Sequence, residues 1–142
     1  MVTANEIMIR NIQTVAPESL LSTALAVMRD QDIRHLVVMK DDELAGVLSN
    51  RDYRRVLERT GPDGTIHGVD SIRVSEIMTP ARDVITARPD TPVLNIAQLM
   101  VIRKVGCIPV VDEQHRLIGL LTQKDVMREL TSARVTPPLP SQ

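Results

Sequence analysis

The sequence is almost without aromatic residues. Its 142 residues include one tyrosine, Tyr53, and no phenylalanine or tryptophan, so the core has to be built from aliphatic side chains and methionine. Proteins that bind single-stranded nucleic acid stack the bases on aromatic side chains. The formal net charge of −1 also provides no basic field for nucleic acid or anionic lipid. We therefore expect no nucleic-acid partner.

Cysteine and long apolar runs are scarce too. Cys107 is the only cysteine, which excludes an internal disulfide and a cysteine-rich zinc site and is typical of a reducing compartment. No run of apolar residues reaches the roughly 18 that a membrane helix needs, and the opening "MVTANEIMIRNIQTV" has no apolar signal core. These absences predict a cytoplasmic protein without a membrane partner.

What the sequence does contain is an internal repeat. The heptads "GVLSNRD" at 46–52 and "GLLTQKD" at 119–125 share a glycine, two aliphatic residues, a hydroxyl residue and a final aspartate. Upstream, "NEIM" at 5–8 matches "SEIM" at 75–78. The offset drifts only from 70 (5 to 75) to 73 (46 to 119). Because an internal repeat decides the architecture, we interpret the chain as two homologous units.

Each repeat predicts the same order of elements: a short helix ending at "IM", an extended segment, an amphipathic helix, a two-stranded hairpin and a last helix. Ser19 or Ser22 is expected to cap the amphipathic helix of the first repeat, and Pro92 to lie in the first turn of its counterpart. Ser49 and Thr122 are the expected N-caps of the last helices. One such unit is too small to bury a sufficient core, so we expect the two to pack together.

The repeats resemble the cystathionine-β-synthase (CBS) domain, and the tandem resembles the CBS pair called a Bateman module. The second repeat carries the resemblance in "SEIMTP", "GCIPVVDE" and "LIGLLTQKDV", and the first has the weaker "NEIMIR", "RHLVVMKDD" and "LAGVLSNRDY". The resemblance covers roughly residues 5–130 and implies an α+β fold. Two β-α-β-β-α repeats would pack as a pseudo-two-fold pair, with ligand clefts between them.

The resemblance also sets the expected domain boundaries and the assembly. The first repeat spans 5–60, a linker and helix lead-in 61–74, the second repeat 75–131, and a disordered proline-rich tail 132–142. The helices carry more apolar surface, such as "LLSTALAVM" and "VLNIAQLM", than one intramolecular contact should cover. Family modules bury such helices against a second copy, so we expect a homodimer, assembled into a disc.

The function that the resemblance implies is regulatory. Family members sense AMP, ADP or ATP, less often S-adenosylmethionine or NAD, with or without Mg²⁺, and they act on a partner protein that the sequence does not name. The chain looks like a stand-alone sensor without catalysis, since no acid–base pair, glycine-rich phosphate loop or metal-ligand spacing is present. The alternative is a ligand-free dimerisation or scaffold module that regulates its partner by contact. Ile9 and Val37, which replace the pattern residues found as Thr79 and Pro109 in the second repeat, favour that alternative for the first repeat.

The repeated Ser/Thr-x-x-Asp step is the centre of the candidate site. A carboxylate can accept hydrogen bonds from both hydroxyls of a ribose, and such charge-assisted bonds are the stronger kind. Asp125 is the expected main contact and Asp52 the weaker one. The plain alternative is that Ser49 and Thr122 cap their helices and that each aspartate favours a first helical turn. The residues alone leave both interpretations open.

The resemblance implies the rest of the site. It places Thr79, Val84, Val105, Gly106, Cys107 and Thr122 around the ligand of Asp125, with Arg34 and His35 of the first repeat directed at its phosphate. The weaker cleft has Ser49 and Asp52 and would receive only Gly106 and Cys107, without a cation. Arg51 and Lys124, which precede the two aspartates, either reach a phosphate or stay solvated.

Overall fold

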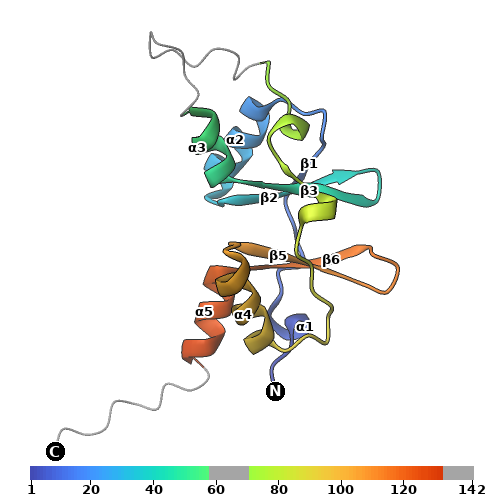
Figure 1. Ribbon diagram of the computed structural model, residues 1–142, viewed down its shortest axis with the longest axis vertical. Coiled ribbons are helices and arrows are strands. Elements are labelled where there is room, and N and C mark those ends of the chain that lie inside the picture. The colour runs from blue at the N-terminus through green and yellow to red at the C-terminus, as the bar shows by residue number, and fades with distance from the viewer. Residues whose placement is uncertain (58–70, 133–142) are drawn as a thin grey trace, which may run out of the picture. The chain divides into compact units, whose positions relative to one another are not determined.

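The computed structural model describes residues 1–57 and 71–132. Residues 58–70, which hold the end of the predicted first repeat and most of the predicted linker, and residues 133–142, nearly all of the predicted tail, lie outside the described residues. The chain forms two compact units. We call Met1–Asn11 with Ile85–Gln142 unit 1, and Ile12–Val84 unit 2. Figure 1 shows a mixed α+β architecture in each of them.

Unit 2 is a four-stranded sheet with helices. The strand order is β1-β2-β3-β4; β1 runs parallel to β2, and the other neighbouring strands are antiparallel. Its strands are β1 (Thr14–Val15), β2 (His35–Lys40), β3 (Glu43–Ser49) and β4 (Thr79–Pro80). Its helices are α2 (Leu21–Gln31), α3 (Asn50–Leu57) and the short 3-10 helices η1 (Val74–Glu76) and η2 (Ala81–Asp83).

Unit 1 has the same plan with shorter outer strands. The hairpin of β5 (Cys107–Val111) and β6 (Leu117–Thr122) is flanked by single bridges, Ala87 parallel to Val110 and Ile9 antiparallel to Leu120. Its helices are α1 (Ala4–Ile7), α4 (Val93–Arg103) and α5 (Gln123–Ser132). In both units, a polar segment, "KDDE" or "DEQHR", joins the two central strands of the predicted hairpin.

The sheet register reproduces the offsets of the sequence repeat. Val15 pairs with Val38 in unit 2, and Ala87 forms a parallel bridge with Val110 in unit 1. Both partners of the second pair lie 72 residues after those of the first (15 to 87 and 38 to 110). Equivalent pairs therefore recur on the parallel side of both hairpins. The predicted homology of the two halves is thus confirmed down to individual residue pairs.

We call the first residues of each sequence repeat its lead-in. Each compact unit contains the lead-in of the other sequence repeat. Thr79, at the start of the second repeat, pairs with Val47 in the hairpin of the first. Conversely Ile9, at the start of the first repeat, pairs with Leu120 in the hairpin of the second. Each hairpin is therefore completed on its antiparallel side by the lead-in of the other repeat.

This crossing explains the glycine that opens both heptads. A Cβ on Gly46 would collide with the backbone carbonyl oxygen of Thr79 and would lie 2.8 Å from the Met78 sulfur. A Cβ on Gly119 would collide with the side chain of Met8. The lead-in passes so close to the central strand that only glycine fits at the crossing.

The exchanged lead-ins also replace the predicted side-chain caps. Leu20, not Ser19 or Ser22, occupies the N-cap of α2, without a side-chain hydrogen bond. The first amide of the helix, on Leu21, donates instead to the carbonyl of Ile72 at 2.8 Å. The predicted serine cap is therefore wrong, because a backbone acceptor from the lead-in already satisfies this amide.

The second repeat begins its helix in the same way. The amide of Val93 donates to the carbonyl of Val2 at 2.9 Å. Pro92 occupies the N-cap, one residue before the first turn in which the sequence placed it.

Both cores are aliphatic, as the lack of aromatic residues predicts. The fully buried side chains include Leu21, Leu36 and Leu48 in unit 2 and Ile96, Ile108 and Leu121 in unit 1. Burying one such side chain is worth roughly 1.5–3 kcal/mol. These cores fix the hairpins, and the hairpins place the start of α3 and of α5, where the candidate site residues lie.

Candidate functional site

The Ser/Thr-x-x-Asp steps form reciprocal helix caps in both units. Thr122 donates to Asp125 Oδ2 from its amide (3.0 Å) and from its hydroxyl (2.8 Å), and the Asp125 amide lies 3.4 Å from Thr122 Oγ1. Ser49 donates to Asp52 Oδ2 at 2.8 Å and 3.0 Å, and the Asp52 amide donates to Ser49 Oγ at 3.2 Å. The predicted N-caps are confirmed, and each aspartate lies in the first turn of its helix.

The caps leave one carboxylate oxygen of each aspartate for another partner. All of the hydrogen bonds above end on Oδ2, and Oδ1 accepts none from the residues that the structure describes. The two carboxylates differ in access, because Asp52 is 8% exposed and Asp125 is about half-buried. Asp125 therefore presents the more accessible acceptor.

In unit 1, four other predicted site residues lie around Asp125. Thr122 is its capping partner, and Cys107 is buried opposite Thr122 in the β5–β6 ladder. Gln123 donates its side-chain amide to the carbonyl of Val105 at 3.4 Å and its backbone amide to the carbonyl of Gly106 at 3.0 Å. The segment 105–107 is thus held against the start of α5 without any cationic side chain of its own.

In unit 2, the equivalent positions carry Arg34 and His35. The carbonyl of Arg34 accepts from the amide of Asn50 at 2.9 Å, and His35 faces Ser49 in the β2–β3 ladder. Arg34 is exposed and His35 is half-buried. The structure therefore places both cationic candidates in the unit of Asp52.

Burial and neighbouring charges determine the protonation state of His35. Loss of water around the ring lowers the pKa of His35 below its usual value of 6.5. The carboxylate of Asp52 raises this pKa, and the guanidinium groups of Arg34 and Arg51 lower it further. The imidazole is consequently neutral at pH 7 in the ligand-free protein. An incoming anion would favour its protonation.

The remaining predicted site residues, Thr79 and Val84, also belong to unit 2. Thr79 pairs with Val47 in β4 next to β3, and Val84 follows η2. The sequence grouped both with Asp125. Both belong to the same compact unit as Asp52. Beside the hairpin that leads to Asp125, Ile9 lies in the position equivalent to that of Thr79.

The sequence analysis missed two amide residues at the start of the last helices. Asn50 and Gln123 both donate their backbone amide to the segment before the first central strand, at Arg34 and Gly106. Because the bonds come from the backbone N–H, which every residue except proline has, the heptads carry no side-chain signal for them. These bonds tie each aspartate-bearing helix to the segment that precedes the first central strand.

Two features are absent from the described residues. Within residues 1–57 and 71–132, no group of three or more histidine, cysteine, aspartate or glutamate side chains is placed to hold a metal ion. Over the same residues, every helix is too short or too polar to span a lipid bilayer.

Comparison with known proteins agrees with the duplicated geometry. A CBS domain-containing protein of Dictyostelium discoideum is 30% identical over 146 aligned residues, which cover 99% of this chain and 98% of that protein. The crystal structure of CBSX2 from Arabidopsis thaliana in complex with AMP superposes with a TM-score of 0.81 at 26% identity, and covers 94% of this chain and 99% of that one.

A larger relative contains the same region as one of its parts. The inosine-5'-monophosphate dehydrogenase of Methanocaldococcus jannaschii is 30% identical over 126 residues, which cover 88% of this chain but only 23% of the enzyme. Residues 4–59 and 74–132 each match the CBS domain. The chain therefore belongs to the CBS-domain family and contains a tandem pair of these domains.

Proposed function

We propose that the protein is a regulatory module that binds an adenosine-containing ligand and performs no catalysis. The observation that carries this proposal is the unused Oδ1 of Asp125, a half-exposed carboxylate whose other oxygen is fixed by Thr122. A carboxylate held in one orientation can accept from the two adjacent hydroxyls of a ribose without first being ordered. AMP is the leading ligand because CBSX2, which is similar over nearly its whole length, was crystallised with it.

The base of the ligand would be held by aliphatic surface and main chain. Val105, Gly106 and Cys107 lie next to the start of α5, which carries Asp125, and would contact the base together with Thr79 and Val84, which the resemblance adds. With Tyr53 as the only aromatic residue of the chain, no stack of aromatic rings holds the base. Selectivity would then rest on the ribose and the phosphate.

The phosphate of the ligand would be bound by Arg34 and His35. The guanidinium of Arg34 is exposed, and the neutral His35 can take up a proton when an anion arrives. ADP, ATP and the diphosphate of NAD would use the same cations for longer phosphate chains, whereas S-adenosylmethionine has no phosphate for them to bind. Asp52 would be the weaker second ribose contact, because its carboxylate is almost fully buried.

The same proposal includes self-association and a regulated protein partner. Apolar side chains remain exposed on the helices of unit 1, and such surface usually marks an interface. We expect at least a homodimer, with the ligand changing how the module contacts a separate protein.

A second candidate function has one observation in its favour. Both aspartates are already used as helix caps, so the heptads have a structural role without any ligand. On that account the protein is a ligand-free scaffold module that regulates its partner by contact.

Thermal unfolding in the presence of AMP, ADP, ATP, NAD and S-adenosylmethionine separates the two candidates. A ligand at 100 times its Kd stabilises a protein by about 2.7 kcal/mol, which is a readily measured shift in Tm. The adenosine-ligand proposal expects a shift with at least one of the five that is reduced in Asp125→Asn. Five ligands without effect at millimolar concentration would favour the scaffold.

A further inference from the structure

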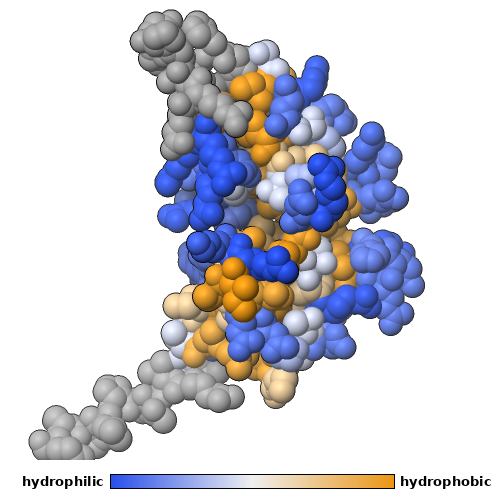
Figure 2. Space-filling view, viewed as in Figure 1, coloured by the Kyte–Doolittle hydropathy of each residue, from blue (hydrophilic) through white to orange (hydrophobic). Residues whose placement is uncertain are grey.

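The last helix of unit 2 carries a row of arginine side chains. Arg51, Arg54 and Arg55 stand at positions i, i+3 and i+4 of α3, a spacing that places them on one side of the helix. All three side chains are exposed. We call these three residues the α3 arginine face. Figure 2 shows strongly hydrophilic surface where Figure 1 draws α3.

The positive charge of this face is not neutralised within the described chain. Over residues 1–57 and 71–132, none of the three guanidinium groups forms an ion pair or a hydrogen bond. The carboxylate of α3, that of Asp52, is 8% exposed and accepts both capping bonds of Ser49. The face therefore presents adjacent like charges to solvent, and like charges at this spacing destabilise a helix.

The helix dipole accounts for only part of this arrangement. It favours cations in the last turn, where Arg54 and Arg55 lie, but it disfavours the cation of Arg51 in the first turn. The equivalent helix of unit 1, α5, has no basic residue in its last turn. Helix stability alone therefore does not explain the arginines.

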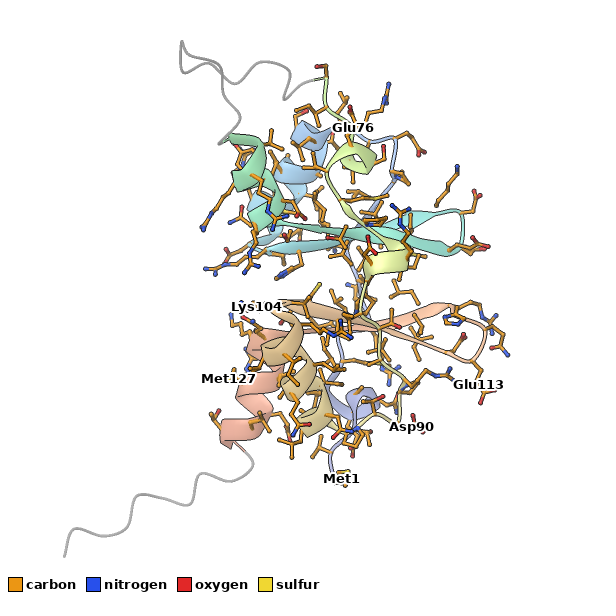
Figure 3. All side chains as sticks on the ribbon, in the orientation of Figure 1. Met1, Glu76, Asp90, Lys104, Glu113 and Met127 are labelled. Atoms are coloured by element: carbon orange, nitrogen blue, oxygen red, sulfur yellow. The ribbon has the colours of Figure 1, made fainter. Side chains whose placement is uncertain are left out.

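The repeat provides an internal reference for the face. At the offset of 73 that aligns the two aspartates, its counterparts on α5 are Lys124, Met127 and Arg128. Met127, which Figure 3 labels on α5, is an apolar residue at the position of Arg54. The same fold is thus built in unit 1 without three arginines, and it does not require them.

The one aromatic residue of the chain lies in the same helix. Tyr53 directly precedes Arg54, is half-buried and packs in part against the core of unit 2. Its counterpart Val126 is only 2% exposed. Tyrosine and arginine are enriched in protein–protein interfaces and among their hot spots. The composition of α3 is therefore typical of a protein-binding surface.

We infer that the α3 arginine face binds an acidic segment of a partner protein. Guanidinium groups pair with carboxylates in a bidentate geometry, and neighbouring Asp or Glu side chains of the segment can engage adjacent arginines together. A short segment matches the size of the face, which extends over about 6 Å of the helix axis.

The surrounding charges favour a short segment over a large polyanion. Unit 2 also exposes three successive acidic side chains, Asp41, Asp42 and Glu43, between and beside its central strands. A nucleic acid or an anionic bilayer extends well beyond one turn of helix and would be repelled by such groups.

The acidic segment would belong to the regulated partner, so the inference rests on that part of the proposed function and not on the adenosine ligand. A protein that binds AMP but no acidic peptide would keep the ligand function and lose the arginine face as a docking surface. A protein that binds the acidic peptide but no adenosine ligand would do the reverse.

Fluorescence anisotropy of a labelled decaglutamate peptide tests the face on the full chain. Labelled decaglutamine and decathymidylate are the comparison probes, and co-sedimentation with vesicles of phosphatidylserine and phosphatidylcholine tests a lipid surface. The double variant Arg54→Gln with Arg55→Gln removes two charges of the face and spares Arg51, a candidate phosphate contact. The matched control, Arg103→Gln with Arg128→Gln, removes two charges from exposed positions of α4 and α5. Arg55→Gln against Arg128→Gln gives the same comparison with single substitutions.

The wild type and the control should bind decaglutamate more tightly than decaglutamine or decathymidylate, and should not sediment with the vesicles. The double variant should bind decaglutamate at least about fivefold more weakly, because each exposed charge pair contributes modestly. Its circular dichroism, urea midpoint and affinity for AMP should match those of the wild type.

Several results would overturn the inference. A wild type that does not bind decaglutamate, or a folded double variant that binds it as tightly as the wild type, would exclude the face as its site. Equal weakening in the control would show attraction by net charge alone. Tighter binding of decathymidylate, or sedimentation with the vesicles, would identify a different class of partner.

Discussion

Units 1 and 2 share a fold and a register but differ in the surroundings of their aspartates. Asp125 is half-exposed, and the equivalents of Arg34 and His35 beside it are Gly106 and Cys107. Asp52 is nearly buried and lies close enough to His35 to influence its pKa. One unit thus has the more open carboxylate, and the other has the cationic side chains. Under the proposed function, the first would contact the ribose and the second the phosphate.

The largest expected effect concerns the glycines at the crossing of the lead-ins. Gly46→Ala forces a Cβ into the backbone carbonyl of Thr79, whereas Gly119→Ala meets the side chain of Met8, which can rotate away. We expect about 3 kcal/mol of lost stability for the first variant and about 1–2 kcal/mol for the second, in the range of overpacked cores. Urea unfolding measures both. Equal losses would show that the two crossings are equally rigid.

The two aspartates should differ in their effect on ligand binding. Asp125→Ala should weaken AMP binding by roughly 1.5–3 kcal/mol, or about ten- to hundred-fold in Kd, since two charge-assisted hydrogen bonds are lost. Asp52→Ala should weaken it less, and both variants should lose about 1–2 kcal/mol of stability, because each aspartate accepts the same pair of capping hydrogen bonds. Isothermal titration calorimetry and urea unfolding give the two quantities. If Asp52→Ala abolished binding while Asp125→Ala left it intact, the ranking of the two carboxylates would be reversed.

Arg34 should distinguish ligands by their phosphate. Arg34→Ala should weaken AMP by about 1 kcal/mol, roughly fivefold, because its guanidinium is exposed and well screened by water, and should leave adenosine binding unchanged. The exposed Arg82 of unit 2, changed to alanine, is the control for a general loss of positive charge. Equal weakening of AMP and adenosine would contradict a phosphate contact.

The smallest expected effect is a pH dependence from His35. Because burial holds its folded-state pKa below 6.5, the unfolded chain binds more protons than the folded one below that pH. The contribution of His35 to stability is therefore complete above pH 6.5 and is lost as the pH falls. His35→Gln should show a smaller decrease in its urea midpoint than the wild type between pH 7.5 and pH 5.5. Parallel decreases in the two proteins would show that other groups cause the loss.

Much of the fold followed from the repeat, because local patterns recur at nearly constant offsets. The hairpins, the last helices and the caps at Ser49 and Thr122 depend on short-range chemistry. The exchange of the lead-ins was not predictable in this way, since both hairpins offer a similar edge to Met8 and Met78. That choice depends on packing between segments far apart in the sequence.

Only part of the local arrangement around the aspartates follows from the sequence. Thr122 and Asp125 are joined by hydrogen bonds, and Cys107 pairs with Thr122, because short-range geometry holds these residues together. Thr79 and Val84 lie in the compact unit that carries Asp52, and their contact with a ligand of Asp125 stays a prediction. The difference in burial between the aspartates was also invisible, because both heptads have the same polarity pattern.

The central claim is that the Asp125 carboxylate recognises a ribose, and the comparison of AMP with 2'-deoxy-AMP tests it most directly. Calorimetry on the wild type should give at least about tenfold tighter binding of AMP, the value of one charge-assisted hydrogen bond. In Asp125→Asn, which keeps the shape and a capping oxygen but loses the charge, the two ligands should bind almost equally, whereas Asp52→Asn should preserve most of the difference. Equal affinity of the wild type for AMP and 2'-deoxy-AMP would contradict the account and leave both heptads as helix caps.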